Sequence, residues 1–304
     1  MSFYNNFRLF KKGIENWFSV ALNMIILKKD VNCNIRNVGT VKINRGENYL
    51  TSSLFRAVVS SCSKELTNKQ IEILKTYLNQ FNKKIITITN LEDGKKFNFL
   101  NKEIFTIFES FFYGEYDYVP YSDEEKTLID IGANIGDTAL YFANKGYIVY
   151  AFEPLPDICD IAEQNINLNQ DYKDKIKLIN KAVSCKKGTI IINYDETNSA
   201  IAGEFNKKGQ EIEVESLTIE DIIETYKIKP YFLKIDCEGC EVNIIKNSNL
   251  RIFSEIIMEY HTNFTGVKEE ILIEFLDSQG FSLCYKNEKD NGIGINHMKK
   301  KSVS

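Results

Sequence analysis

The sequence lacks several features that define membrane and secreted proteins. No apolar run reaches the roughly 18 to 20 residues that a membrane-spanning helix needs. The N-terminus has no basic segment followed by an apolar core and a small-residue cleavage site, so we expect no signal peptide and a cytoplasmic location. The seven cysteines are odd in number and irregularly spaced, which fits reduced thiols in that compartment.

Basic residues are scarce outside the first part of the chain. Residues 1–45 hold eight of the 38 Lys and Arg residues but only two of the 42 Asp and Glu residues, so a basic head precedes an acidic body. A nucleic-acid substrate would need a basic stripe beside the active site. We therefore expect no nucleic-acid partner.

The length of 304 residues exceeds that of a typical single domain, about 100 to 200 residues. We predict an N-terminal region over residues 1–99, made of an amphipathic helix and a small α+β unit, and a catalytic domain over residues 100–304. In the first region the apolar spacing predicts a helix at residues 66–81 and a strand at 85–89.

The amphipathic helix is predicted over residues 5–28, where apolar residues recur at helical spacing. These residues are Phe7, Phe10, Ile14, Trp17, Phe18, Ala21, Leu22, Ile25 and Ile26. Because lysines flank the stripe, the helix would lie on a membrane surface or an anionic partner, or else against the protein's own core or a second subunit. We favour docking on protein, which is how most amphipathic helices bury their stripe.

Strand-like and helix-like segments alternate through the rest of the chain. Strands are predicted at residues 128–131, 147–152, 176–180, 231–235, 255–260, 281–285 and 292–295, helices at 103–113, 158–168, 219–226, 242–246 and 269–278, and a β-rich insertion at 189–194 and 212–214. This alternation predicts an α/β fold with a doubly wound, mostly parallel sheet covered by helices on both faces. Ligands of such sheets bind at the carboxyl ends of the strands.

The segment at residues 128–137 (LIDIGANIGD) joins an apolar strand to a helical pattern through Gly132 and Gly136. Glycine at 132 permits backbone torsions closed to other residues and lets a ligand approach the main chain. The start of the helix supplies unpaired N–H donors. Strand, glycine turn and helix together predict a nucleotide-cofactor site.

Two residues of this segment favour S-adenosylmethionine (SAM) over a dinucleotide. The dinucleotide fingerprint G-x-G-x-x-G needs its second glycine, which makes room for the pyrophosphate, at the position of Asn134. Asp130 suits a ligand that carries an ammonium group, as SAM does, and would repel two phosphates.

Polar residues follow the next two strands of the alternation. Glu153 ends the second strand, about 20 residues after Gly132, where an acid accepts hydrogen bonds from the two ribose hydroxyls of a nucleoside. Asn180 ends the third strand, and we weigh contact with an adenine edge equally against an ordinary turn role.

The fourth and fifth strands end in a concentration of acids. Asp236, Glu238 and Glu241 follow the fourth strand, and Glu259 and His261 end the fifth. These groups would supply a catalytic or metal-binding function, whereas Glu238 and Glu241 would alternatively complement the start of a helix. Cys237 and Cys240 form a C-x-x-C pair without a second pair, which disfavours a redox or zinc role.

Five motifs occur in an order that resembles the FkbM family of SAM-dependent methyltransferases. They are residues 130–136 (DIGANIG), 151–154 (AFEP), 217–221 (LTIED), 234–239 (KIDCEG) and 259–261 (EYH). The resemblance covers about residues 100–286. It implies a class I, Rossmann-like methyltransferase fold with a seven-stranded sheet, and usually methylation of a hydroxyl on a sugar or glycosylated metabolite. It also places both cysteines among the acids of a D-x-E-G-x-E pattern, which further weakens the redox interpretation.

The expected activity is therefore SAM-dependent O-methylation of a saccharide or glycoconjugate. The alternatives are methylation of a nitrogen or a non-sugar hydroxyl, and a non-catalytic SAM-binding partner protein, which the intact acids disfavour. We assign the general base to His261 and acceptor positioning to Asp236, with Glu259 beside them. A divalent cation held by Asp236, Glu238 and Glu259 is the competing hypothesis for the proton step.

Overall fold

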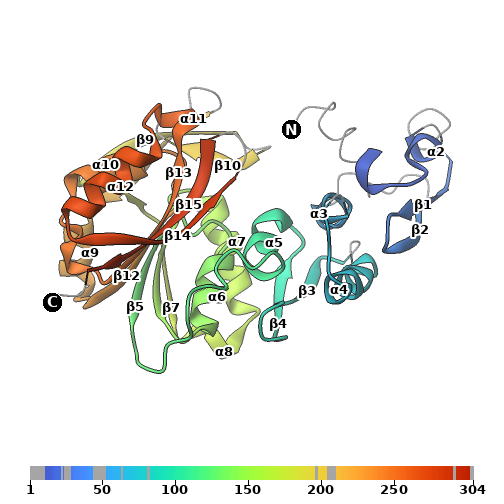
Figure 1. Cartoon of the computed structure of the whole chain (residues 1–304), viewed down its shortest axis with the longest axis horizontal. Coiled ribbons are helices and arrows are strands. Elements are labelled where there is room, and N and C mark those ends of the chain that lie inside the picture. Colours follow the sequence, from blue (N-terminus) through green and yellow to red (C-terminus); the bar gives the residue numbers. More distant parts are fainter. Residues whose placement is uncertain are drawn as a thin grey trace. The chain divides into compact units, whose positions relative to one another are not determined.

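The computed structural model describes residues 11–21, 23, 29–43, 53–62, 64–80, 83–195, 198–203, 210–289 and 292–301. The chain forms two compact units, Met1–Val119 and Pro120–Ser304, whose elements are labelled in Figure 1. Within the described ranges, every helix is too short or too polar to traverse a lipid bilayer.

The first unit combines short helices with two antiparallel hairpins. Its elements are α2 (Trp17–Ala21), β1 (Val31–Ile35), β2 (Gly39–Ile43), α3 (Ser53–Ser61), α4 (Asn68–Leu78), β3 (Ile85–Thr89), β4 (Lys96–Leu100) and α5 (Ile104–Phe111). β1 pairs with β2, and β3 pairs with β4. α4 begins after a capping box, in which the Thr67 hydroxyl accepts from the Gln70 amide and the Gln70 side chain accepts from the Thr67 amide.

Helix α5 belongs to the first unit, although our predicted boundary at residue 99 assigned it to the second. Its Phe111 ring lies 4.7 Å from the ring of Phe97 and 5.5 Å from that of Phe99, both on β4. Its Phe108 ring lies 5.6 Å from Tyr77 of α4. Because these fully buried aromatics share one core, the compact unit extends to Val119.

The predicted continuous helix over residues 5–28 is wrong within its described part. The chain leaves the helix at Ile14, which forms an antiparallel bridge with Ile35 of β1. Backbone pairing on both sides of Ile14 replaces helical hydrogen bonds, and a Cβ atom at Gly13 would overlap the carbonyl oxygen of Val59. Ile14 is buried while Phe18 is 65% exposed, so only part of the apolar stripe is covered. Residues 1–10, 22 and 24–28 lie outside the described residues, and membrane contact or self-association through this segment stays a prediction.

The second unit is built on a seven-stranded sheet in the order β14-β15-β13-β12-β5-β6-β7. Its strands are β5 (Thr127–Ile131), β6 (Ile148–Phe152), β7 (Ile176–Ile179), β12 (Pro230–Ile235), β13 (Glu255–His261), β14 (Phe281–Glu288) and β15 (Ile293–Lys300). Pairing from β7 through β13 is parallel, and β15 runs antiparallel to both of its neighbours. The predicted α/β fold with a mostly parallel sheet is confirmed.

Helices cover both faces of this sheet (Figure 1). They are α6 (Asp137–Asn144), α7 (Pro156–Asn167), α8 (Gln170–Lys173), α9 (Ile219–Tyr226), α10 (Glu241–Asn247), α11 (Thr262–Thr265) and α12 (Glu269–Ser278), with a 3₁₀ turn η3 at Leu250–Ile252. α6 and α7 lie on one face, and α9, α10 and α12 on the other. α9 begins at its predicted residue because Thr218 and Asp221 form a capping box.

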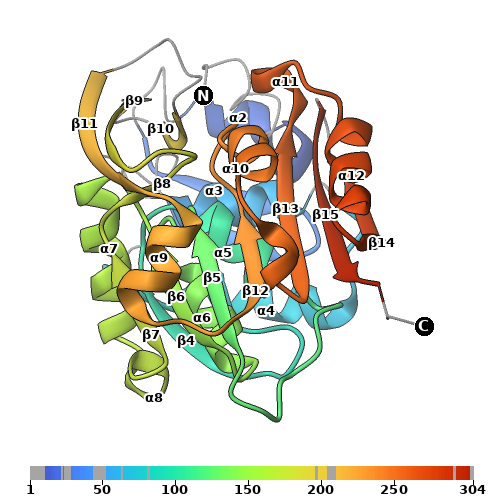
Figure 2. The same ribbon diagram turned by 90° about the vertical axis from the view of Figure 1, so that its left-hand side faces the viewer.

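The predicted β-rich insertion forms a separate small sheet between β7 and α9. Its strands are β8 (Ala182–Val183), β9 (Gly188–Asp195), β10 (Asn198–Gly203) and β11 (Gln210–Leu217), in the order β10-β9-β11-β8. In Figure 2 the insertion (yellow) lies above α7, on the side where the parallel strands end. Ile192 and Val214 bury against Leu155, which anchors the insertion beside the end of β6.

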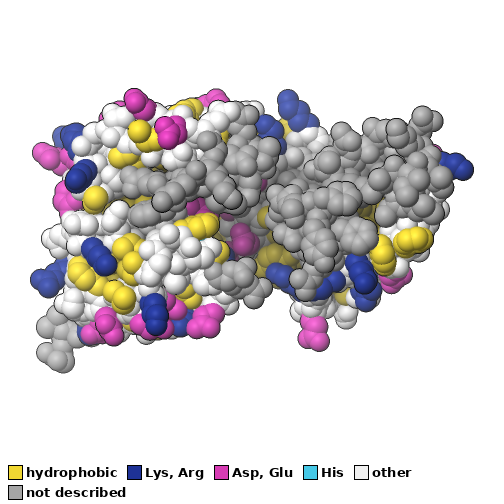
Figure 3. Space-filling view, turned by 90° about the horizontal axis from the view of Figure 1, so that it is seen from above, with side chains coloured by type: hydrophobic (Ala, Val, Ile, Leu, Met, Phe, Trp, Pro, Cys, Tyr) yellow, Lys and Arg dark blue, Asp and Glu magenta, His cyan; other side chains and the backbone are white. Residues whose placement is uncertain are grey.

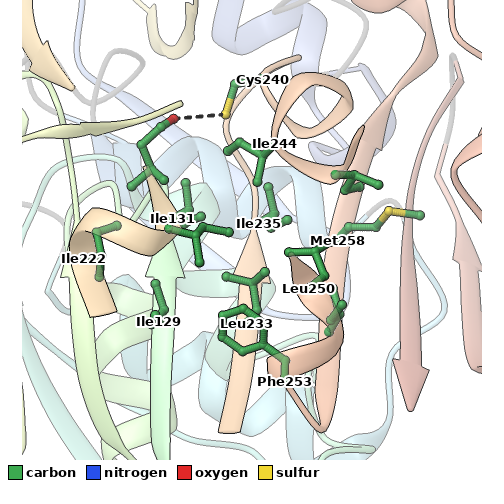
Figure 4. Close-up of a cluster of buried hydrophobic side chains, with 14 of the residues drawn as sticks. Ile129, Ile131, Ile222, Leu233, Ile235, Cys240, Ile244, Leu250, Phe253 and Met258 are labelled. Carbon is green, nitrogen blue, oxygen red and sulfur yellow. Dashed lines mark hydrogen bonds between the residues drawn. The ribbon is translucent and has the colours of Figure 1, made fainter. Parts of the chain in front are cut away.

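One face of the sheet carries the apolar core drawn in Figure 4. Ile129, Leu233 and Ile256 come from three adjacent strands and are fully buried. They pack against Ile222 of α9 and Ile244 of α10, which are also fully buried. Apolar burial of this kind contributes about 25 cal/mol per Å², so this face fixes the strands whose ends form the site.

We expect Leu233→Ala to lower the free energy of unfolding by about 2 to 5 kcal/mol, because it leaves a cavity in this core. Urea denaturation of the full chain measures the change. The matched control is Leu283→Ala on β14, where the side chain is 40% exposed and the cost should stay within about 1 kcal/mol. Equal costs for the two variants would contradict the packing described.

Candidate active site

The glycine turn at residues 132–136 joins β5 to α6 at the carboxyl edge of the sheet. Gly132 has a φ of 78°, and a Cβ atom there would overlap the carbonyl oxygen of Asp236. The amides of Gly132 and Ala133 both donate to the carbonyl oxygen of Phe152, each at 3.0 Å. The turn is therefore packed between the ends of β6 and β12. We predicted that Gly132 admits a ligand to the main chain, but its close neighbour is the protein's own backbone at Asp236.

Asp130 is completely buried and has an internal cationic partner. Lys234 Nζ lies 3.0 Å from Asp130 Oδ1, and Thr138 Oγ1 donates to Asp130 Oδ2 at 2.6 Å. Burial alone would lower the pKa of Lys234, but the charges of Asp130 and Asp236 outweigh it and raise that pKa above its ordinary value. The carboxylate that we predicted to attract the ammonium group of SAM is thus already neutralised by Lys234.

Glu153 closes β6 with its carboxylate held by backbone amides. Oε2 accepts from the amide of Asn134 at 3.0 Å, and Oε1 accepts from the amide of Leu155 at 2.9 Å. Burial raises the pKa of Glu153 to about 7, against the lowering effect of these two hydrogen bonds. The side chain is therefore fixed at the predicted place, beside the glycine turn, and changes charge near neutral pH.

The two asparagines of the predicted site have different surroundings. Asn134 has a φ of 46°, and its side-chain Oδ1 atom is buried without a hydrogen bond from the described residues. Asn180 Nδ2 donates to the carbonyl oxygens of Glu153, at 2.9 Å, and Pro154, at 3.1 Å. Asn180 therefore holds the loop after β6, and its contact with adenine stays a prediction. Gly136, with a φ of 79°, packs against Ala162 of α7.

Asp236, Glu238 and His261 converge beyond the adjacent ends of β12 and β13. One ligating atom from each lies within 4.8 Å of those of the other two. His261 Nε2 lies 3.4 Å from Glu238 Oε2, and Asp236 Oδ2 lies 3.6 Å from Lys234 Nζ. The side chains of Asp236 and Glu238 are 28% and 26% exposed. Two of the three predicted catalytic residues, Asp236 and His261, are thus brought together at one edge of the sheet.

His261 contacts Glu241, whose carboxylate is fully buried. Glu241 Oε1 accepts from the His261 amide at 2.9 Å and lies 3.4 Å from Nδ1 of its ring. Glu241 Oε2 accepts from the amide of Gly239 at 2.8 Å. The His261 ring also stacks on Phe264 of α11, with 5.7 Å between centroids. The imidazole therefore has one orientation, with Nε2 toward Glu238.

The structure argues against His261 as the general base. Burial lowers the pKa of His261, but contact with Glu241 and the charges of Glu238 and Asp236 raise it to about 9. Because an imidazolium at neutral pH has no lone pair for a proton, His261 in this state cannot accept one. Burial, together with the charges of Asp236 and Glu241, raises the pKa of Glu238 to about 8, against the lowering effect of His261.

Glu259 does not join this cluster. Its Oε1 lies 3.2 Å from Lys289 Nζ, in the segment between β14 and β15. Glu259 is an interior residue of β13, so its side chain leaves the strand before the carboxyl end that His261 occupies. We predicted that Glu259 and His261 act together because they lie two residues apart at the end of the same predicted strand.

Cys237 and Cys240 are joined by a disulfide, with 5.4 Å between their Cα atoms. This corrects the expectation that all cysteines are reduced thiols. The Cys240 sulfur packs 3.8 Å from the carbonyl oxygen of Val183, as Figure 4 shows. The disulfide closes the turn at residues 237–240, which carries Glu238 and directly follows Asp236.

Sequence reasoning missed Lys234 and underrated Glu241. Lys234 occupies a strand position in a run of apolar residues, and a lysine there is expected to be paired because unpaired charges are costly to bury. That signal was available in the sequence, but nothing in it named Asp130 as the partner. Glu241 looked like an acid at a helix start, and only the fold brings it behind His261.

The sheet order, the single antiparallel strand β15 and the helices on both faces define a Rossmann-like, class I methyltransferase fold. The family model of the methyltransferase FkbM domain matches residues 130–283, slightly more than half of the chain. The chain belongs to this family of methyltransferases.

Solved structures with a similar fold include methyltransferase FkbM from Methylobacillus flagellatus KT. It is 14% identical with a TM-score of 0.44, and the match covers 83% of this chain and 62% of that one. The present chain therefore spans less than two thirds of that protein. Magnesium protoporphyrin IX methyltransferase from Synechocystis PCC 6803 with bound SAM is 10% identical, with a TM-score of 0.38 and coverage of 84% and 94%. A comparison with curated proteins returned no match.

We expect Lys234→Met to destabilise the fold by about 3 to 5 kcal/mol, because it leaves Asp130 charged and buried without a cation. Urea denaturation of Lys234→Met, Asp130→Asn and the double variant forms a double-mutant cycle. The double variant should lose less stability than the two single losses combined. Simple additivity would show that the pair is not coupled.

Proposed function

We propose that this chain is a SAM-dependent O-methyltransferase that acts on a hydroxyl group of a saccharide or glycoconjugate. The observation that supports the proposal is that two groups of residues with different chemistry lie along one edge of the sheet. The turn at 132–136 and Glu153 lie at the ends of β5 and β6, whereas Asp236, Glu238 and His261 lie beyond β12 and β13. Membership of the FkbM methyltransferase family supports the reaction class.

The ends of β5 and β6 suit the nucleoside part of SAM. Glu153 has each carboxylate oxygen held by one backbone amide, which leaves lone pairs for the two ribose hydroxyls. Asn134 Oδ1, buried and without a hydrogen bond from the described residues, is an acceptor for the ammonium group of the methionine part. Asn134 thereby takes the role first given to Asp130, whose charge Lys234 neutralises.

The ends of β12 and β13 suit a hydroxyl acceptor. Asp236 and Glu238 present partly exposed carboxylates, and carboxylates accept hydrogen bonds from several hydroxyls at once. A saccharide offers many such hydroxyl donors. Figure 3 shows the molecule from above, which is the side on which the parallel strands end. Acidic and basic side chains are interspersed on the described surface there.

The reaction is an in-line displacement that the protein promotes by positioning. The acceptor oxygen attacks the sulfonium methyl carbon, a C–O bond forms, and the C–S bond breaks to release S-adenosylhomocysteine. The hydroxyl proton must leave, and the carboxylate of Asp236 receives it, because His261 and Glu238 both hold a proton at neutral pH. His261 instead stabilises negative charge at this end of the site.

Methylation of a nitrogen or a non-sugar hydroxyl, and SAM binding without turnover, are the competing functions. Calorimetric titration of the full chain with SAM tests the cofactor, and mass spectrometry tests acceptors in a panel of glycans, amines, non-sugar alcohols and short RNA. We expect SAM to bind and one methyl group to be added to a glycan. Transfer to an amine or RNA alone would contradict the proposed acceptor, and binding without transfer to any acceptor would favour the non-catalytic function.

The affinity for SAM should depend on pH through Glu153. Since burial raises the pKa of Glu153 to about 7 and its ionised form accepts the ribose hydroxyls better, affinity should be constant above pH 8. Below pH 7 it should fall by up to about tenfold per pH unit. Glu153→Gln should weaken binding by about 1 to 3 kcal/mol and remove this pH dependence. Titrations at pH 6, 7 and 8 measure both effects, and an unchanged profile in the variant would exclude Glu153 from the site.

A further inference from the structure

We propose that Asp236, Glu238 and His261 bind one divalent transition-metal ion of the Mn²⁺, Fe²⁺ or Zn²⁺ class beside the methyl donor. The ligand set differs from the one suggested by the sequence, because His261 replaces Glu259. The three residues form the group with metal-ligand geometry among the described residues.

The separations fit the coordination sphere of such an ion. Two neighbouring ligands at bond lengths of about 2.0 to 2.2 Å lie roughly 2.8 to 3.1 Å apart at octahedral angles and roughly 3.3 to 3.6 Å apart at tetrahedral angles. His261 Nε2 and Glu238 Oε2 are 3.4 Å apart, which is longer than the roughly 2.8 Å of a direct charge-assisted hydrogen bond. Asp236 lies with them inside a 4.8 Å span, so a small rotation of its exposed side chain completes a three-sided site.

Glu241 prepares His261 for this role. Metal-binding histidines usually turn one ring nitrogen to the ion and the other to a carboxylate or carbonyl that fixes the ring. Here Nε2 faces Glu238, Nδ1 lies 3.4 Å from the buried Glu241 Oε1, and the ring stacks on Phe264. Glu241 is therefore a positioning residue that holds His261 through the main-chain amide of His261, while Nδ1 lies near the Glu241 carboxylate without a hydrogen bond, and the amide of Gly239 fixes the other carboxylate oxygen.

The local charge also favours a cation. Four carboxylates, those of Asp130, Asp236, Glu238 and Glu241, lie near three cations: Lys234, His261 and Lys289, the last of which acts on Glu238 and pairs with Glu259. Three of these four acids gather around the imidazole, at 0% to 28% side-chain exposure, where water screens poorly. A bound divalent ion would offset this excess of negative charge.

The donor set identifies the class of ion. One imidazole and two carboxylates suit Mn²⁺, Fe²⁺ and Zn²⁺, whereas Mg²⁺ and Ca²⁺ prefer all-oxygen ligands. Asp236 lies against the turn at Gly132, so the ion would lie next to the SAM site. Because only a neutral imidazole can bind a metal ion, the ion displaces the proton of His261 when it binds. Its role in catalysis, which rests on the proposed function, is to lower the pKa of the acceptor hydroxyl and so ease its deprotonation.

Binding of Mn²⁺ to the full chain without SAM tests the site directly. The loss of the electron paramagnetic resonance signal of free Mn²⁺ counts bound ions, and Mn²⁺ avoids soft sulfur ligands, so the cysteines should not compete. We expect one site in the wild type, its loss in His261→Ala and Glu238→Gln, and weakening of about 10 to 100-fold in Glu241→Gln. Glu259→Gln is the matched control and should change affinity by less than about threefold.

Circular dichroism and SAM titration of every variant separate a local effect from unfolding. Absence of a Mn²⁺ site in a wild type that binds SAM would overturn the metal site and leave the methyltransferase function intact. Equal Mn²⁺ binding by wild type, His261→Ala and Glu238→Gln would place the ion elsewhere and also overturn the proposal. Mn²⁺ binding without SAM binding would instead count against the proposed function alone.

Discussion

The buried ion pair between Asp130 and Lys234 is the interaction on which the carboxyl edge of the sheet depends. It joins neighbouring strands β5 and β12, and both side chains are at most 1% exposed. Lys234 Nζ also reaches Asp236 Oδ2, at 3.6 Å, and the carbonyl oxygen of Gly132, at 3.4 Å. The cation of Lys234 therefore contacts both the glycine turn and Asp236. Loss of Lys234 would leave Asp130, Asp236 and the carbonyl oxygen of Gly132 without this cation.

The acids along this edge differ in their hydrogen-bond and ionic partners, and these partners determine the role of each acid. Asp130 is neutralised by Lys234 and serves the fold. Glu153 is held by backbone amides, one on each carboxylate oxygen, which leaves further lone pairs on both oxygens. Glu238 lies beside other acids, which raise its pKa, and beside His261. His261 keeps its proton near neutral pH. These three buried or half-buried acids at one edge thus acquire different chemistry from their neighbours.

The sequence predicted the fold well where periodicity is strong. α9 and α12 have the bounds expected from apolar spacing, and the parallel order follows from the β/α alternation. It failed at residues 5–28, because the pairing of Ile14 with Ile35 is a tertiary contact that local spacing does not report. It also drew the boundary at residue 99, although the aromatic residues of α5 pack in the core of the first unit, which extends to Val119.

For the candidate site, the sequence located residues but not their partners. Glu153 lies at the strand end that spacing indicated. The partner of Asp130 and the protonation of His261 depend on which strand ends meet in space. Such contacts between distant residues are not encoded in spacing along one chain.

Amide hydrogen exchange of the full chain with and without SAM tests most directly whether this edge holds the cofactor. SAM should slow exchange in residues 132–138, at Glu153 and Leu155, and in residues 236–239, because bound cofactor would cover these backbone amides. The strands β14 and β15 should exchange at unchanged rates. SAM binding that leaves exchange at 132–138 and 236–239 unaltered, or that protects only segments away from this edge, would contradict the account.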